Sequence, residues 1–187
     1  MQKVIYRSEI ENYIVQMEPE VVSYIEEGQI ETFEGFDKFS LVAFDWYNIK
    51  DVDLDPSQML LYLDKDDLFV ICESRESYEE ALKCFAGAPS NERALYLFFK
   101  NLFKGDTKNL EDLEDRISKL DDAVIHGSKE DIREQIVDIR YEVLRLKKYY
   151  DRFEEIFDEL CDNDNEMISE EFLSYFDVLN NRCGRMI

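Results

Sequence analysis

The sequence contains few of the residues that build metal–sulfur and nucleophilic sites. Its 187 residues include one histidine, His126, and four cysteines, none of which forms a Cys-x-x-Cys pair. A structural zinc site needs four closely spaced ligands, and a Ser-His-Asp triad needs a histidine beside its nucleophile. His126 lies in a predicted turn, where we expect a solvated side chain. The cysteines are interpreted as reduced thiols of a cytosolic protein.

Glycine motifs and long apolar runs are also missing. The six glycines form neither GxGxxG nor GxxxxGK, so no phosphate-binding loop is indicated. The longest apolar run, Ala94–Phe99, is far shorter than the roughly 20 residues that a membrane span needs. No basic-then-apolar signal segment follows Met1. We therefore expect the polypeptide as given to be soluble, and no motif in it supports an enzyme.

Positive charge is scarce. Lys and Arg number 22 against 44 Asp and Glu, which gives a net charge of -22. This balance argues against nucleic-acid binding, which needs clustered bases, and against docking on anionic lipid. An acidic surface instead concentrates cations around itself. Because 45% of the residues are hydrophobic and 13% aromatic, we expect a folded protein and not a disordered acidic tail.

The most acidic stretch runs from residue 151 to residue 171. It holds ten acids and one base, Arg152. Carboxylate oxygens are the ligands that Mg²⁺ prefers, so this stretch could collect hard cations. A solvated helix face is the favoured interpretation, and a defined site remains the alternative.

The first part of the chain predicts a small, mainly antiparallel sheet with short helices. The best strand is 39–49, and two further strands, 59–63 and 68–72, form a hairpin around Asp64–Asp67. Residues 4–6 are a possible edge strand, and 30–36 form a strand or a turn. Helices are predicted at 20–27, after Pro19, and at 77–85, with Ser77 as N-cap.

The remainder of the chain has helical periodicity. A helix at 91–104 is expected to weaken or kink at Gly105 and Asp106. Residues 110–125 and 132–160 repeat apolar residues every 3.5 positions, which predicts an antiparallel hairpin, with Ser128 capping its second arm. The far end of that arm is expected to pack on 91–104 or on the sheet. A last helix, capped by Ser169, stays periodic to Met186, which predicts that the natural protein continues.

The serial order of these elements resembles the cytoplasmic domain of the CorA-type divalent-cation transporters. FSLVAF (39–44) is similar to that family's first well-marked strand, and MLLYLDKDDLFVICES (59–74) to its next two strands. LEDLEDRISKLDDAVI (110–125) and the segment 130–160 are similar to its acidic helix and return helix. EEFLSYFDVLNNR (170–182) resembles the start of its stalk helix. The family's Gly-Met-Asn tripeptide and both membrane helices are absent from this sequence.

The resemblance implies an α+β fold in three parts. Residues 1–89 would form the α/β sheet subdomain, 90–168 the long helical hairpin, and 169–187 the start of the stalk helix. The implied function is the regulatory domain of a homopentameric Mg²⁺ channel, with transport of Co²⁺ or Zn²⁺ as a variant. Mg²⁺ bound between neighbouring subunits would favour the closed state. The chain would lie at the cytoplasmic face of the plasma membrane and reach the membrane only through a C-terminal segment missing here.

The resemblance also implies regulatory metal ligands. The family's stalk-helix aspartate falls on Asp177, and Asn180 stands where the family tends to have another acid. Glu20, Glu26 and Glu27 are candidates, by position alone, for the partner acid from a neighbouring subunit, with Glu20 or Glu26 preferred. As an isolated piece, we expect this chain to be a monomer or a weak oligomer.

A second hypothesis is a freestanding acidic coiled-coil module for protein–protein interaction. Such a module would bury the same apolar seams against a partner protein. A stable oligomer that forms without metal would favour it.

Overall fold

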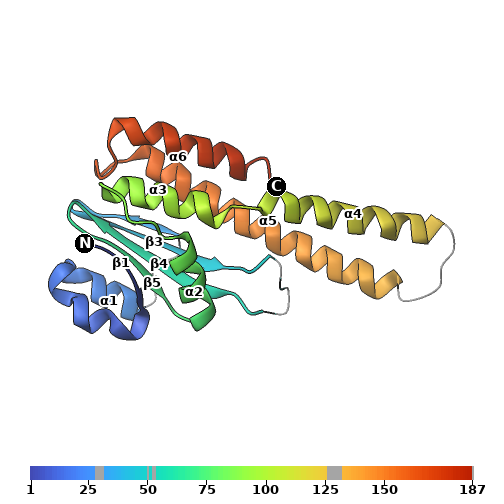
Figure 1. The fold of residues 1–187 in the computed structure, drawn as a ribbon, viewed down its shortest axis with the longest axis horizontal. Coiled ribbons are helices and arrows are strands. Elements are labelled where there is room, and N and C mark those ends of the chain that lie inside the picture. Colours follow the sequence, from blue (N-terminus) through green and yellow to red (C-terminus); the bar gives the residue numbers. More distant parts are fainter. Residues whose placement is uncertain (28–31, 50, 52–53, 126–131, 187) are drawn as a thin grey trace.

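A computed structural model describes residues 1–27, 32–49, 51, 54–125 and 132–186 (Figure 1). Its centre is a five-stranded sheet in the order β1-β5-β4-β3-β2. The strands are β1 (Gln2–Tyr6), β2 (Phe33–Gly35), β3 (Phe39–Trp46), β4 (Ser57–Asp64) and β5 (Leu68–Cys72). Strands β2 to β5 pair antiparallel, whereas β1 pairs parallel to β5 at the edge. The predicted α+β class and the hairpin are confirmed.

Both faces of the sheet are covered, as the apolar run in β3 predicts. Leu41 and Ala43 face a smaller core with η1 (Arg7–Gln16) and α1 (Glu20–Glu27), whereas Val42 and Phe44 face the larger helical layer. Figure 1 shows α1 on one side of the sheet and α3, α5 and α6 on the other. Successive residues of a strand point to opposite faces, so a strand buried on both sides needs apolar residues at nearly every position.

The larger layer contains α2 (Arg75–Cys84), α3 (Asn91–Leu102), α4 (Asp106–Ile125), α5 (Ile132–Asp162) and α6 (Glu170–Cys183). The break predicted between α3 and α4 is confirmed. Gly105 has a φ of +95°, a left-handed conformation that residues with a side chain rarely adopt. It lets the chain redirect without a long loop.

One capping prediction is wrong, and a second is confirmed for its position alone. The N-cap of α2 is Ser74 and not Ser77, because the two residues bond reciprocally: Ser77 N–H donates to Ser74 Oγ at 3.1 Å, and Ser74 N–H donates to Ser77 Oγ at 3.1 Å. The helix therefore begins earlier than predicted. Ser169 is the N-cap of α6, but its side chain makes no capping bond; its N–H donates to Glu92 Oε2 at 2.7 Å. The predictions for Ser128 and His126 fall outside the described residues.

The two halves of α5 have different environments. In the inner half Tyr150, Phe153 and Phe157 are fully buried, and the Phe153 ring lies 4.8 Å from that of Phe44 on the sheet. In the outer half α5 packs against α4, and Ile136 and Val143 are still 47% and 40% exposed. The predicted antiparallel hairpin is present (Figure 1), but one partner helix cannot cover the whole seam.

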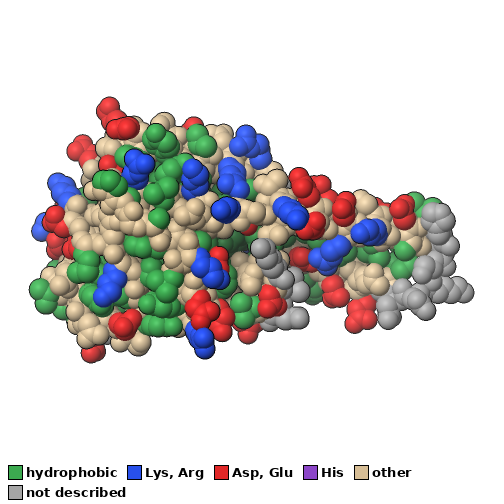
Figure 2. Space-filling view, in the orientation of Figure 1, with side chains coloured by type: hydrophobic (Ala, Val, Ile, Leu, Met, Phe, Trp, Pro, Cys, Tyr) green, Lys and Arg blue, Asp and Glu red, His purple; other side chains and the backbone are tan. Residues whose placement is uncertain are grey.

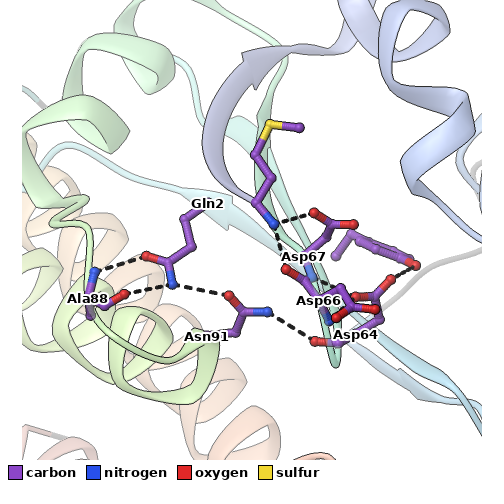
Figure 3. Close-up of polar contacts among 8 residues, drawn as sticks. Gln2, Asp64, Asp66, Asp67, Ala88 and Asn91 are labelled. Carbon is purple, nitrogen blue, oxygen red and sulfur yellow. Dashed lines mark hydrogen bonds and ion pairs between the residues drawn. The ribbon is translucent and has the colours of Figure 1, made fainter.

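The edge strand β1 is held by a chain of amide hydrogen bonds (Figure 3). The Gln2 side chain accepts from Ala88 N–H at 2.9 Å and donates to Ala88 O at 3.0 Å and to Asn91 Oδ1 at 3.1 Å. Asn91 Nδ2 in turn donates to Asp64 O at 3.2 Å. These contacts link the only parallel strand among the described residues to the β4–β5 turn and to the start of α3.

None of the helices in the described part of the chain combines the length and the hydropathy that a bilayer span needs.

Candidate cation-binding site

The residues predicted from the stalk-helix resemblance lie on α6, beside the end of α5. Phe176 and Leu179 are buried and fix the face that α6 turns toward the body, so Asp177, between them in sequence, is exposed. Its backbone carbonyl accepts a hydrogen bond from Asn181 Nδ2 at 2.8 Å. The Asp177 carboxylate therefore projects from a helix whose orientation is fixed by packing on its other side.

Asn180 lies one turn further along α6 and contacts α5. Its Nδ2 donates to Asp158 Oδ1 at 2.5 Å, which directs the amide nitrogen to α5. The amide oxygen is then the atom that Asn180 could offer to a cation. Asp158 belongs to the acidic stretch but was not singled out from the sequence. Only the antiparallel packing of α5 and α6 brings it beside Asn180.

A third feature of this region is the half-buried thiol of Cys161. Burial raises its pKa to about 11, and the nearby carboxylates of Asp177, Asp158 and Asp162 act in the same direction. Negative charge therefore gathers around the junction of α5 and α6. Within the described residues, however, no three acidic, cysteine or histidine side chains converge on one cation position.

The other predicted ligands lie on α1, across the sheet. Glu20 is exposed in the first turn of that helix. Glu26 and Glu27 belong to its last turn, and their side chains lie outside the described part. One chain does not bring α1 and α6 together, since they cover opposite faces of the sheet (Figure 1).

The acidic stretch 151–171 is mostly in contact with solvent. Eight of its ten acids are exposed, and Arg152 pairs with Glu155 at 3.1 Å. Figure 2 shows Asp and Glu side chains spread along the hairpin and the rim of the body, with Lys and Arg between them. The geometry agrees with a solvated helix face carrying dispersed negative charge.

Comparison with known proteins gives a family. A family model described as CorA-like Mg²⁺ transporter protein matches residues 11–187. No curated protein gives a significant match.

Solved structures share the fold. The CorA magnesium transporter from Methanocaldococcus jannaschii has a TM-score of 0.74 at 14% identity, covering 100% of this chain and 63% of that one. The soluble domain of CorA from the same organism has a TM-score of 0.72 at 16% identity, covering 100% and 80%. The ZntB cytoplasmic domain from Vibrio parahaemolyticus has a TM-score of 0.69 at 11% identity, covering 99% and 81%.

These identities establish a likeness of fold. This chain spans less than two thirds of the length of the complete CorA transporter.

Proposed function

This chain belongs to the CorA-like Mg²⁺ transporter family, and on that premise we propose that it is the cytoplasmic regulatory domain of a divalent-cation channel. Mg²⁺ bound between neighbouring copies favours the closed state, and Co²⁺ or Zn²⁺ are alternative cations. The observation that carries the proposal is the agreement in fold, along the whole chain, with a soluble domain of CorA. The domain itself carries out no chemical step.

The charge of the chain supports cation control. At -22, copies of this chain repel one another, and a cation shared between two carboxylates offsets that repulsion. A ligand that binds the assembled arrangement more tightly than the separated one shifts the population toward assembly. Loss of the cation then restores the repulsion and releases the subunits.

The proposed ligands are Asp177 and Asn180 of one copy with Glu20 or Glu26 of its neighbour. Their placement on opposite sides of one sheet is compatible with a site shared by two chains. Mg²⁺ keeps several of its waters and is held by one or two carboxylates in many protein sites, so a pair of acids is a sufficient set. Asp158 adds a further carboxylate beside Asn180.

Calorimetric titration with Mg²⁺ tests this ligand set. We expect saturable binding to the wild-type chain and weaker binding to Asp177→Ala. Glu171→Ala is the matched control, because Glu171 is an exposed acid on the same helix and should leave binding unchanged. Equal binding by Asp177→Ala and the wild type would remove Asp177 from the site.

A freestanding interaction module remains a second candidate, favoured by one observation. Val137, Tyr141 and Leu144 are 44%, 71% and 46% exposed on the outer half of α5. Exposed apolar groups in a row are typical of surfaces that bind another protein. Light scattering in chelator distinguishes the two, because an interaction module would form a stable oligomer without metal.

A further inference from the structure

A second apolar row runs along the outer half of α5, apart from the seam that packs on α4. Val137, Tyr141 and Leu144 are 44%, 71% and 46% exposed. Their spacing of four and three residues places them on one face of the helix. The outer half of α5 extends beyond the sheet (Figure 1), so this face stays in contact with solvent.

Charged side chains of opposite sign lie at the two ends of this row. Glu134 and Asp138 belong to its outer end, and Lys148 belongs to its inner end, where α5 enters the body. At 3.6 residues per turn, all three lie within about 60° of Tyr141 around the helix axis. Asp138, Tyr141, Leu144 and Lys148 also line one groove of about 730 Å³. We call this face the Tyr141 stripe; it consists of Glu134, Val137, Asp138, Tyr141, Leu144 and Lys148.

The charged ends of the stripe are not neutralised by other described parts of the chain. Glu134, Asp138 and Lys148 are exposed, and none of them forms an ion pair or a side-chain hydrogen bond with another described residue. Arg145 lies on the same face but is engaged within its own chain, since it donates a hydrogen bond to Leu54 O at 3.1 Å. The charges open to a partner are therefore acids at one end and a lysine at the other.

This order of charges is complementary to itself when a second copy runs antiparallel. Glu134 and Lys148 each lie seven residues from Tyr141. A two-fold axis near Tyr141 therefore places Glu134 of each copy beside Lys148 of the other and brings the two Tyr141 rings together. A parallel arrangement would instead set like charges against each other. Such a two-fold contact uses the same surface patch on both copies.

The contact is short, which limits its strength. From Glu134 to Lys148 the stripe spans about 21 Å, at a rise of 1.5 Å per residue. A helix pair of this length buries less than the roughly 1,200 Å² at which stable interfaces begin, so we expect a weak dimer. At about 0.15 M salt the Debye length is about 8 Å, so repulsion between distant acids of the two copies is screened while charge pairs in contact persist.

We propose that the Tyr141 stripe binds the same stripe of a second copy of this chain, antiparallel around a two-fold axis. The contact is separate from the proposed cation ligands on α6 and needs no Mg²⁺. It depends on neither candidate function. Because it dissociates on dilution, it also differs from the stable oligomer expected of a freestanding interaction module.

Sedimentation equilibrium of the 187-residue chain in EDTA tests this contact, since the chelator removes any assembly that needs Mg²⁺. At about 0.15 M KCl we expect a monomer–dimer equilibrium with a Kd of about 0.1 mM. Glu134→Lys and Lys148→Glu should each weaken the dimer about tenfold, because each turns two attractive contacts per dimer into repulsive ones. The double variant Glu134→Lys/Lys148→Glu should regain the wild-type Kd, because the exchanged charges pair again.

Lys147→Glu is the matched control, because it changes the net charge as Lys148→Glu does but at a residue that lines a different groove. It should dimerise as the wild type does. Glu134→Lys reduces the negative net charge, so general repulsion cannot explain a weaker dimer in that variant. All three substituted residues are exposed, so each variant should fold. A monomer up to about 0.5 mM, single variants that dimerise like the wild type, or a double variant that does not recover would overturn the proposal.

Discussion

The buried hydrogen bond between Tyr150 and Asp106 should contribute measurably to stability. The Tyr150 hydroxyl donates to Asp106 Oδ2 at 3.0 Å, and the two residues are 0% and 6% exposed. Burial, the Asp106 charge and this hydrogen bond together raise the pKa of Tyr150 well above its usual value. The bond connects the first residue of α4 to the inner half of α5, where the hairpin meets the body.

Tyr150→Phe removes the donor and leaves the buried acceptor in place. A hydrogen bond to a charged group contributes about 1.5–3 kcal/mol, so we expect the free energy of unfolding to fall by about 2 kcal/mol. For a chain of this size, that loss lowers the melting temperature by about 4–8 °C. Asp106→Asn keeps an oxygen that can accept the bond and should cost less.

Urea denaturation followed by the fluorescence of Trp46 measures these changes. Tyr141→Phe is the matched control on the same helix; its side chain is 71% exposed, and its effect should stay within about 0.5 kcal/mol. The double variant Tyr150→Phe/Asp106→Asn should show a coupling energy of at least about 0.5 kcal/mol. A loss below about 0.5 kcal/mol for Tyr150→Phe would refute the reasoning.

Three further predictions concern the backbone and the thiols. Gly105→Ala should lower the free energy of unfolding by about 1–2 kcal/mol, because a φ of +95° strains a residue with a side chain. The added Cβ meets no atom within 4 Å, so the cost comes from the backbone alone. Gly87→Ala, without that strain, should be neutral in the same thermal or urea unfolding. The free energy of urea unfolding should fall as the pH rises above 9. Burial raises the thiol pKa values of Cys72, Cys84 and Cys183 to about 12, so that above pH 9 only the unfolded chain releases these protons. Each of the three thiols then lowers the free energy of unfolding by about 1.4 kcal/mol per pH unit. Iodoacetamide at pH 8 should label Cys161 before these three, since it alone among the four is partly exposed; equal labelling would contradict the burial pattern.

Much of the fold could be predicted because its signals are local. Strand β3 is apolar at nearly every position, which indicates burial on both faces, and the 3.5-residue repeat of α5 marks a helix with one seam. The parallel pairing of β1 could not be predicted, since it depends on where a distant segment returns to the sheet edge. Nor did the repeat reveal that Ile136 and Val143 stay exposed, because periodicity indicates which face is apolar and not how much of it a partner covers.

The candidate sites were less predictable, because they too depend on which distant segments the fold brings together. Asp177 and Asn180 came from a resemblance along one helix, but Asp158 joins them only through packing between helices. The three-part division at residues 89 and 168 stays a prediction.

The proposed function depends most on Mg²⁺ joining copies of this chain. Sedimentation equilibrium with and without Mg²⁺, at constant ionic strength set by KCl, measures this directly. We predict a monomer or weak oligomer without Mg²⁺, a larger mean mass with it, and no increase for Asp177→Ala. A mass that does not change with Mg²⁺, or a tight pentamer already present in chelator, would contradict the account.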